Sequence, residues 1–377
     1  MDIRIHSSLD EINPADWDRL NQTTNPTLSH RFLSALEHNN CVGEKFGWVS
    51  HHIAAYDESD TLVGAMLLYI KDNSYGELVF DWSWADAFHR AGLPYYPKGV
   101  CAIPYTPATG TRLLIAAQAN ADEVCSHLFD AALQQARQLR LSSLHWLFTN
   151  ETDTRFLEQH GLAIRLDCQY HWHNQAYQDF DDFLSRLSSR RRKEIRRERR
   201  LARESGLQIE IVNGHQANTQ QLLDAAHFYQ TTYDKKAGLA TLNHGFFCEL
   251  AEHVPETLLL IFARDSDRTI ACAIFFVGPD TLYGRNWGCV TYIPNLHFEL
   301  CYYQGINYCI KNGLKHFEPG AQGKHKISRG FMPSETWSAH WIAHDAFRTA
   351  IAEFSSNEKR AMQAHIEILK EKSPYKL

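Results

Sequence analysis

Several features that would assign this chain of 377 residues to a familiar class are missing. No apolar run approaches the roughly 20 residues that a membrane-spanning helix needs, so we expect no membrane span. The first residues, MDIRIHSSLDEINPADWD, are acidic and polar, unlike a secretory signal peptide. The nine cysteines are scattered and form no CxxC pair, which argues against a disulfide framework or a zinc ribbon. Together these features predict a reduced, cytoplasmic protein.

The motifs of several common enzyme classes are missing as well. The sequence contains no Walker loop, no GxSxG and no GxGxxG, so kinase, hydrolase and dehydrogenase activities lack support. Two histidine pairs, His171 with His173 and His340 with His344, have no third ligand at a useful spacing. We therefore expect no metal site and no tightly bound cofactor.

What is present is the composition of a folded, soluble protein. Apolar residues make up 44% of the chain and charged residues 22%, which excludes a disordered chain, a collagen-like repeat and a bare coiled coil. At roughly 150 residues per domain, the length predicts two domains. Aromatic residues, at 12%, are numerous enough to line clefts as well as cores.

The predicted elements occur in the same order in both halves of the chain. In residues 1–175, short helices precede a pair of strands, a helix over 122–140 and a further strand. Residues 207–350 repeat this order, with a helix over 298–312 that ends at Gly313. The segments TLVGAMLLYIKDNSYGE and TIACAIFFVGPDTLYGR are also faintly similar. The pattern predicts two copies of one α/β fold.

One strongly basic segment lies between the halves. Residues 186–203 hold ten basic residues and two acidic ones, whereas the whole chain has a net charge of −6. Strong helix formers fill the segment, Ser188 or Ser189 can cap it, and Gly206 ends it. Closely spaced arginines repel one another unless an anion compensates them, and the guanidinium group suits phosphate. The helix is therefore a solvated linker, a binding surface for an anionic ligand or RNA, or an element docked on the acidic body.

The long segment FELCYYQGINYCIKNGLKHFEPGAQGKHKISRGF, residues 298–331, resembles a bacterial family of predicted N-acyltransferases. That family is related to the Fem peptidoglycan aminoacyltransferases and to the wider Gcn5-related N-acetyltransferase (GNAT) superfamily. Further matches are FDWSWADAFHRAGLPYYPK, YHWHN, the FLSRLSSRRRKEIRRERR block, LYGRNWGC and SAHWIAH, so the likeness covers nearly the whole chain. The resemblance implies an α/β (α+β) chain of tandem GNAT-like domains, each a mixed, mostly antiparallel sheet flanked by helices.

With this fold in mind, the chain divides into four predicted parts. Residues 1–178 form a first GNAT-like domain, which by resemblance holds the acceptor, and 179–206 form the Arg-rich connecting helix. Residues 207–350 form a second GNAT-like domain with the acyl-transfer cleft, and 351–377 a C-terminal helix and tail.

The resemblance implies two kinds of activated donor. Fem relatives take an amino acid from aminoacyl-tRNA, and ordinary superfamily members take an acetyl group from acetyl-CoA. The usual R/Q-x-x-G-x-G/A loop, whose backbone N–H groups hold the CoA pyrophosphate, is missing from WGCVTYIPNLHFELCYYQ. The first half offers only YTPATGTRLL, with a single glycine. This departure argues against coenzyme A binding and favours an unusual acyl donor.

Acyl transfer to an amine requires a group that takes the amine proton and groups that stabilise the carbonyl oxygen. Glu318, at the end of a predicted strand, could do the first or simply form an ion pair. His325 has a suitable pKa range but could equally be an ordinary loop histidine. We predict both as catalytic candidates.

A wider set of residues is predicted to contact substrate. Arg285, in an apolar strand, needs either a ligand anion or Glu299 as partner. At least one of Tyr302 and Tyr303 is expected to pack in the core. The acidic and aromatic stretch that begins at Asp81 suits an amine-bearing acceptor, although a packed loop would explain it equally well. The substrate-binding candidates are Asp81, Trp82, Asp86, Tyr95, Arg285, Trp287, Tyr303, Gln322, Lys324, Lys326 and Arg329.

Two functions of different classes follow. The first is an N-acyltransferase that moves an acyl or aminoacyl group from aminoacyl-tRNA or acyl-CoA to an amine-bearing small molecule or cell-wall precursor. The second is a non-catalytic protein that keeps the duplicated fold and binds RNA or another polyanion. The polyanion contacts are predicted to be Arg191, Arg192, Arg196 and Arg197. The loop from Glu318 to Arg329, which combines a carboxylate, a histidine and three cations, favours the enzyme.

Overall fold

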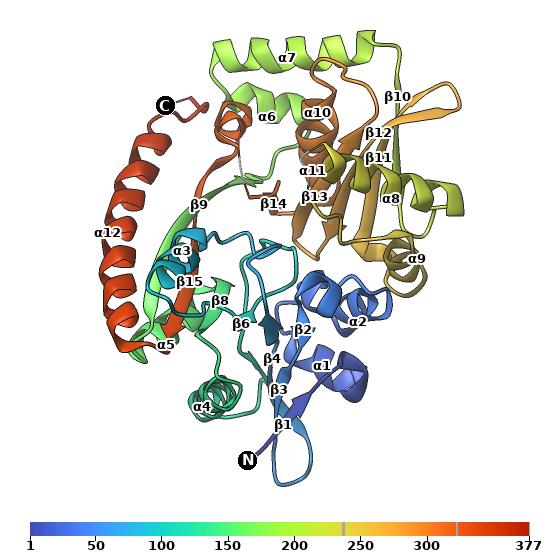
Figure 1. The fold of residues 1–377 in the computed structure, drawn as a ribbon. Helices are drawn as coiled ribbons and strands as arrows, with labels where there is room; N and C mark the ends of the chain where they lie inside the picture. Colours follow the sequence, from blue (N-terminus) through green and yellow to red (C-terminus); the bar gives the residue numbers. More distant parts are fainter. Residues whose placement is uncertain (236–237, 322, 377) are drawn as a thin grey trace. The chain divides into compact units, whose positions relative to one another are not determined.

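The computed structural model describes residues 1–235, 238–321 and 323–376, and the chain divides into two compact units (Figure 1). Unit 1 consists of Met1–Cys168 and Glu335–His365, and unit 2 consists of Gln169–Ser334 and Ile366–Leu377. Three elements cross the division: strand β9 (Ala163–His173), strand β15 (Met332–Ile342) and helix α12 (Asp345–Lys370). Neither unit is therefore one continuous segment of chain.

Unit 1 contains two sheets with helices packed on them. The first sheet is antiparallel and has the order β1-β3-β4-β7. The second sheet has the order β15-β8-β6-β5-β2, and its strands β15 and β8 pair antiparallel. Its elements are β1 (Asp2–His6), α1 (Pro14–Leu20), α2 (His30–His38), β2 (Val49–Ser50), β3 (His52–Tyr56), β4 (Leu62–Met66), β5 (Tyr69–Lys71), α3 (Trp82–Arg90), β6 (Lys98–Cys101), β7 (Leu114–Ile115), α4 (Ala121–Gln138), β8 (Ser143–Thr149) and α5 (Glu151–Gln159).

The core of unit 1 lies between its strands and α4. The Asn120 side chain accepts a hydrogen bond from the Glu123 N–H and so caps the first turn of α4. The apolar stripe of this helix, which includes Val124 and Leu128, packs against β3 and β4. Gly64 on β4 makes this approach close, because a Cβ there would lie 2.3 Å from Val124.

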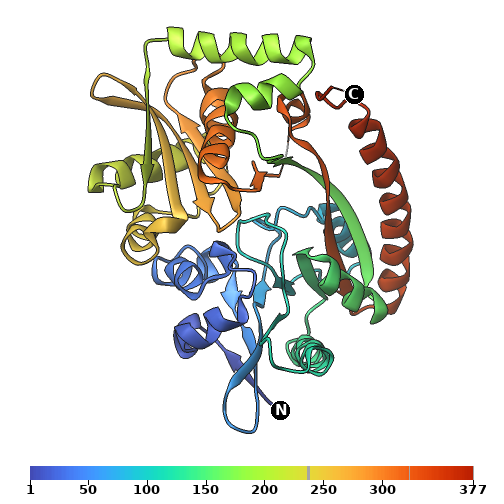
Figure 2. The same ribbon diagram turned by 180° about the vertical axis from the view of Figure 1, so that it is seen from behind.

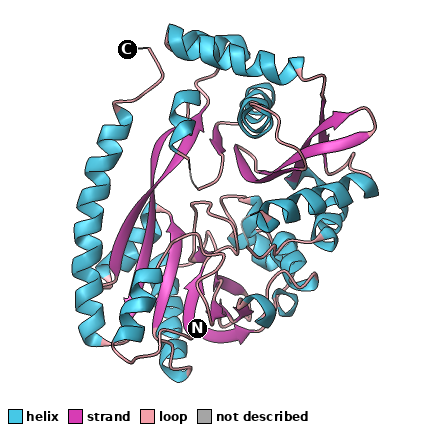
Figure 3. Ribbon diagram, turned by 45° about the horizontal axis from the view of Figure 1, so that its top comes forward, coloured by secondary structure: helices cyan, strands magenta, loops and turns pink. Residues whose placement is uncertain are grey.

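Unit 2 contains a sheet of order β10-β11-β12-β13-β14-β9. Its pairs are antiparallel except that β13 and β14 run parallel. Figure 2 shows this unit from behind, and Figure 3 distinguishes its helices from its strands by colour. Its elements are α6 (Phe180–Arg186), α7 (Ser189–Glu204), β10 (Gln208–Asn213), α8 (Thr219–Asp234), α9 (His244–His253), β11 (Leu258–Asp265), β12 (Arg268–Val277), β13 (Thr281–Cys289), α10 (Leu296–Phe298), a π-helical turn (Glu299–Tyr303), α11 (Gln304–Asn312), β14 (His316–Glu318) and a 3-10 helix (Lys324–Arg329).

Helix α8 fixes the position of β13. Asn218 and Gln221 form a reciprocal capping box at the start of the helix. The helix then packs so closely on β13 that a Cβ at Gly288 would lie 1.9 Å from the Phe228 carbonyl oxygen. Helix α11 also packs against β13, and Gly313 ends it with a φ of +68°, a conformation that favours glycine. Helix α7 is a separate element at the edge of the unit (Figure 1).

Some of the predicted domain and helix boundaries differ from those in the structure. The predicted single connecting segment 179–206 contains two helices, α6 and α7, and both belong to unit 2. Residues 335–350, predicted in the second domain, belong to unit 1, because β15 pairs with β8 from Trp337 to Ile342. The last helix begins at Asp345 rather than at 351. Within the described residues, no helix is both long enough and apolar enough to cross a membrane.

Candidate functional site

A pocket of about 240 Å³ opens in unit 2 where its two parallel strands part. Strands β13 and β14 pair over only three residues, ending at Tyr283 opposite Glu318. The next residues of both strands, Gly284 to Trp287 and Pro319 to Ala321, line the pocket. Gly284 allows the two strands to stay close where they begin to separate, because a Cβ at this position would lie 3.1 Å from Pro319 Cα.

A β-bulge places Arg285 beside this opening. On β12, Ile274 pairs with Asn286 while the next residue, Phe275, pairs with Gly284, so Arg285 is the extra residue of β13. A bulge takes one residue out of the ladder and redirects its neighbours, and bulges are frequent next to active sites. The bulge therefore supplies main-chain groups and a guanidinium group to the pocket wall.

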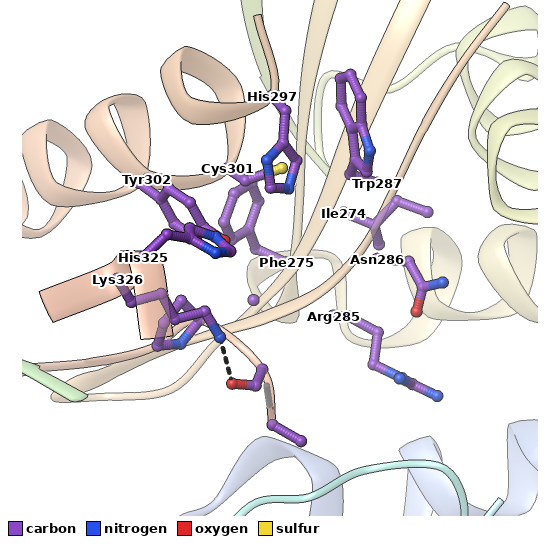
Figure 4. Close-up of a pocket in the computed structure, with 14 residues that line it drawn as sticks. Ile274, Phe275, Arg285, Asn286, Trp287, His297, Cys301, Tyr302, His325 and Lys326 are labelled. Atoms are coloured by element: carbon purple, nitrogen blue, oxygen red, sulfur yellow. Dashed lines mark hydrogen bonds between the residues drawn. The ribbon is translucent and has the colours of Figure 1, made fainter. Parts of the chain in front are cut away.

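The two walls of the pocket have different character (Figure 4). On the strand side lie Arg285, Asn286 and Trp287, and the indole ring of Trp287 meets the His297 ring edge-on at 5.0 Å. The opposite side is built by the π-helical turn and the 3-10 helix. It contributes Cys301, Tyr302, His325 and Lys326.

His325 and Lys326 give the pocket two titratable groups whose pKa values are both lowered. The His325 Nε2 lies 2.9 Å from the Tyr302 hydroxyl. Burial, with the charges of Arg329 and Lys326, lowers the pKa of His325, so its imidazole is neutral at pH 7. Lys326 is 2% exposed and its Nζ donates to the Gly320 carbonyl at 2.6 Å. Burial lowers the pKa of Lys326 to about 7, which leaves the amine about half charged at neutral pH.

Arg285 has a buried donor with no protein acceptor. Its Nε is buried, and no hydrogen bond reaches that atom from any residue that the structure describes. The predicted partner Glu299 is not available, because its carboxylate pairs with Arg199 at 3.1 Å and accepts from Gln304 at 2.7 Å. Glu299 is therefore not the partner of Arg285, and the Nε donor faces the pocket without a protein acceptor among the described residues.

Other predicted site residues of unit 2 lie outside the pocket lining. The Tyr303 hydroxyl donates to Glu198, and Arg329 donates to Tyr303 at 3.1 Å and forms an ion pair with Glu198 at 2.6 Å. Tyr303 and Arg329 therefore fasten α7 to the pocket wall instead of facing a ligand. Glu318 is half-buried at the end of β14, one residue before the lining begins, and Lys324 is exposed. Gln322 lies outside the described residues.

The predicted acceptor residues of unit 1 separate into a buried pair and an exposed pair. Asp81 and Tyr95 are buried, with the Tyr95 hydroxyl donating to Asp81 at 2.6 Å and the Lys98 ammonium bound to the same carboxylate. They belong to a structural charge cluster. Trp82 is 43% exposed, and Asp86 pairs with Arg90 at 3.2 Å on the surface.

Helix α7 has an inner and an outer face. Ile195, Glu198, Arg199 and Ala202 turn inward, with Ile195 and Ala202 buried and the Arg199 guanidinium stacked on Phe180. Of the predicted polyanion contacts, Arg191 and Arg192 are half-buried, and Arg191 pairs with Glu194 at 2.7 Å. Arg196 and Arg197 are exposed, although Arg196 also contacts Asp181 at 2.9 Å. The exposed cations of the outer face are Arg190, Lys193, Arg196, Arg197, Arg200 and Arg203.

Two lining residues, His297 and Cys301, were not predicted from the sequence. Tyr302 was predicted only as one of two tyrosines, of which at least one packs in the core. Tyr302 is 4% exposed, so its burial fits a core residue, and only its bond to His325 separates it from Tyr303. Asn286 lies with Arg285 and Trp287 on a strand that the sequence predicts to face the cleft, and it lines the pocket.

The two sheet-and-helix units define an α/β protein with mostly antiparallel sheets, which confirms the predicted fold class. Residues 8–377 match the FemAB-like family, described as peptidoglycan biosynthesis and recognition, and the chain belongs to this family. The predicted relationship to Fem proteins is thereby confirmed. No curated protein sequence matches the chain.

Solved structures share the fold at low sequence identity. FemX is 11% identical with a TM-score of 0.53, and the match covers 93% of this chain and 100% of FemX. L-PGS from Bacillus licheniformis is 9% identical with a TM-score of 0.54, over 90% of this chain and 96% of that one. The C-terminal domain of a putative lysylphosphatidylglycerol synthetase from Agrobacterium fabrum is 9% identical with a TM-score of 0.52, over 93% and 97%.

Proposed function

We propose that this protein is an N-acyltransferase that uses the unit 2 pocket to move an acyl or aminoacyl group from an activated donor to an amine. The observation that carries the proposal is the pocket itself, which opens where β13 and β14 part and is lined by Arg285, His325 and Lys326. Membership of a family described as peptidoglycan biosynthesis and recognition supports a cell-wall precursor as the amine-bearing acceptor.

His325 is the proposed acceptor of the amine proton. An amine attacks an acyl carbonyl only as the free base, and it loses a proton as the new N–C bond forms. The C–O bond of an aminoacyl-tRNA, or the C–S bond of an acyl-CoA, breaks as the carbonyl re-forms, and the proton taken from the amine is returned to the departing oxygen or sulfur. The lowered pKa of His325 keeps its imidazole in the form that accepts this proton at neutral pH. Tyr302, bonded to His325 Nε2, orients the ring and can share the proton. Glu318, which precedes the lining, remains a second candidate for holding the ammonium group.

Lys326 and Arg285 are the proposed partners of negative charge. The carbonyl oxygen of the donor becomes negative as the amine attacks, and cations in a partly dry pocket stabilise that charge strongly. The buried Nε of Arg285 gains an acceptor, and the charged form of Lys326 is favoured at the same time. Trp287 supplies an apolar surface for the transferred group.

The outer face of α7 supports a polyanionic donor. Glu198 on the inner face of this helix binds Tyr303 and Arg329. Tyr303 directly follows Tyr302 in the π-helical turn, and Arg329 ends the 3-10 helix that carries His325 and Lys326. The exposed cations of α7 therefore lie on an element fastened directly to the pocket wall. Phosphates of a tRNA would find them there, so we favour aminoacyl-tRNA over acyl-CoA as co-substrate.

Transfer assays with purified protein test the proposal. Aminoacyl-tRNA and acetyl-CoA are supplied separately, each with an amine-bearing cell-wall precursor. We expect K326M and H325Q to lower kcat at least tenfold, while K324M, an exposed neighbour outside the lining, keeps wild-type turnover. In the wild type, kcat/KM should fall as the pH drops below the lowered pKa of His325, since protonated His325 cannot take the amine proton.

The same assays distinguish the second candidate, a non-catalytic polyanion-binding protein, which the cations of α7 favour. For that protein neither donor would support turnover, while tRNA would still bind with a steep salt dependence. Turnover unaffected by both H325Q and K326M would remove the unit 2 pocket from the reaction.

A further inference from the structure

A second cavity lies in unit 1, and nothing in the transfer reaction uses it. Its volume is about 420 Å³, larger than the unit 2 pocket. It is formed by the end of α4, the segment after α3, and the end of β15. The lining residues are Phe88, Leu93, Pro94, Tyr96, Pro97, Ala136, Arg137, Arg140, Leu141, Ser142, Trp341, Ala343 and His344.

The walls of this cavity are mainly apolar. Phe88 belongs to a buried cluster with Tyr95 and Ile342, and Leu93 and Tyr96 pack on that cluster, so the cavity is backed by a rigid core. The two polar side chains of the lining that carry hydroxyl groups are already engaged. The Tyr96 hydroxyl bonds to Ser74 at 2.8 Å, and the Ser142 hydroxyl donates to the Tyr95 carbonyl. The walls therefore offer contact surface rather than hydrogen bonds.

Charge in this cavity is of one sign. Arg137 and Arg140 line it, and no acidic side chain is among its described lining residues. Both arginines are exposed, and neither guanidinium forms a hydrogen bond or ion pair with any residue that the structure describes. Arg140 also holds a φ of +52°, a backbone conformation that is uncommon for residues other than glycine.

A helix end explains only part of this arrangement. Cations near the C-terminus of α4 interact favourably with its dipole, but that effect needs no cavity beside them. Ligand sites are typically mostly apolar cavities of 300–1,000 Å³ with a few polar groups that fix orientation. Two unpaired guanidinium groups beside apolar walls suit a carboxylate or phosphate attached to a hydrocarbon chain, because arginine binds both oxyanions with forked geometry.

We propose that this unit 1 cavity binds a free amphipathic anion, an aliphatic chain with one carboxylate or phosphate head. The head would meet Arg137 and Arg140, and the chain would lie against Phe88, Leu141 and Trp341. Since one water molecule takes about 30 Å³ in the liquid, the cavity has room for roughly a dozen non-hydrogen atoms. The site is separate from the transfer pocket, so its test does not depend on the proposed reaction.

Binding is measured by calorimetry and thermal melting with decanoate, decyl phosphate and the uncharged decanol. All are used below the concentrations at which they form micelles. We expect both anions to bind saturably and at least tenfold more tightly than decanol. The double variant R137Q/R140Q should lose that advantage while its affinity for decanol stays the same. R155Q, an exposed arginine of α5 outside the lining, is the matched control and should bind like the wild type.

A second variant tests the chain-binding part. Ala343 is exposed and lines the cavity, so A343W fills space without disturbing the core. We expect A343W to melt like the wild type and to bind none of the three compounds. The proposal is overturned if neither anion binds, if R137Q/R140Q binds decanoate as the wild type does, or if A343W leaves binding intact. Binding to phosphatidylglycerol vesicles without binding of free decanoate would also overturn it.

Discussion

Lys326 is the residue whose charge depends most on what the unit 2 pocket holds. It is 2% exposed, and burial lowers its pKa to about 7. An anion in the pocket would attract the charged ammonium form and so raise the pKa of Lys326 again. Ligand binding and proton uptake are therefore expected to be linked at this one side chain.

This linkage gives a prediction with a definite sign. At pH 8 the free protein holds Lys326 mostly neutral, so binding an anion should take up a large fraction of one proton. At pH 6 the amine is already charged, so uptake at Lys326 should vanish, and any proton still taken up belongs to His325, whose pKa is lowered in the same pocket. Calorimetry with sulfate, which has no titrating proton in this range, in buffers of different ionisation enthalpy measures the uptake. K326Q should abolish it and K324Q should not; equal uptake at both pH values would contradict the assignment.

Some residues of the candidate site could be predicted from the sequence and others could not, for a physical reason. His325 and Lys326 could be predicted because they share one short loop with glycines at its ends. Arg329 could not be told from them, since its partner Glu198 lies on a helix far away in the chain. Arg285 was noticed for its charge in an apolar strand, but the bulge that carries it depends on pairing with β12. The choice between ligand and structural partner was decided by tertiary contacts.

At the scale of elements, α7 combines two tasks on opposite faces. Glu198 and Arg199 hold the pocket wall, and the outer face carries six exposed cations. The sequence predicted this helix from its helix formers and from Gly206, which follows it with a φ of +78°. It did not predict which arginines face outward. Ser188 occupies the N-cap position but makes no side-chain capping bond.

Charge removal on the outer face tests the role of this helix. We expect R190Q/K193Q/R197Q/R200Q to weaken tRNA binding and to reduce its salt slope, because fewer counterions are released. The helix should stay intact, since these four side chains are exposed. Circular dichroism checks that point. A variant with the same change of charge elsewhere, R19Q/R90Q/R155Q/R348Q, is the control. If both variants bind tRNA alike, general charge rather than α7 determines binding.

At the scale of the whole molecule, the chain does not follow its two-part sequence repeat. The faint internal similarity predicted two consecutive domains, whereas unit 1 includes residues 335–365. Strand β15 pairs with β8 from Trp337 to Ile342, an antiparallel pairing between segments almost 200 residues apart. Local signals such as caps and turn residues cannot reveal such a return, since periodicity describes a strand but not its partner.

This interleaving predicts how fragments behave. Residues 1–168 alone lack β15 and α12, so β8 would keep β6 but lose its partner on the other edge, and the Ile342 side of the core would be open. We expect this fragment to show no cooperative melting. The same fragment joined by a flexible linker to residues 335–365 should recover it, together with the near-ultraviolet signal of Trp146, which is 1% exposed. Cooperative melting of residues 1–168 alone would show that the returning segment is dispensable.

Because β15 lies far along the sequence from its partner β8, their pairing also affects folding during synthesis of the chain. Its residues leave the ribosome only after nearly all of unit 2 has been synthesised. At 5–20 residues per second, β8 then waits roughly ten seconds or longer with one edge unpaired. An open strand edge can pair with other chains, so translation speed and nascent-chain chaperones should affect the yield of this protein more than that of a chain whose domains follow one another.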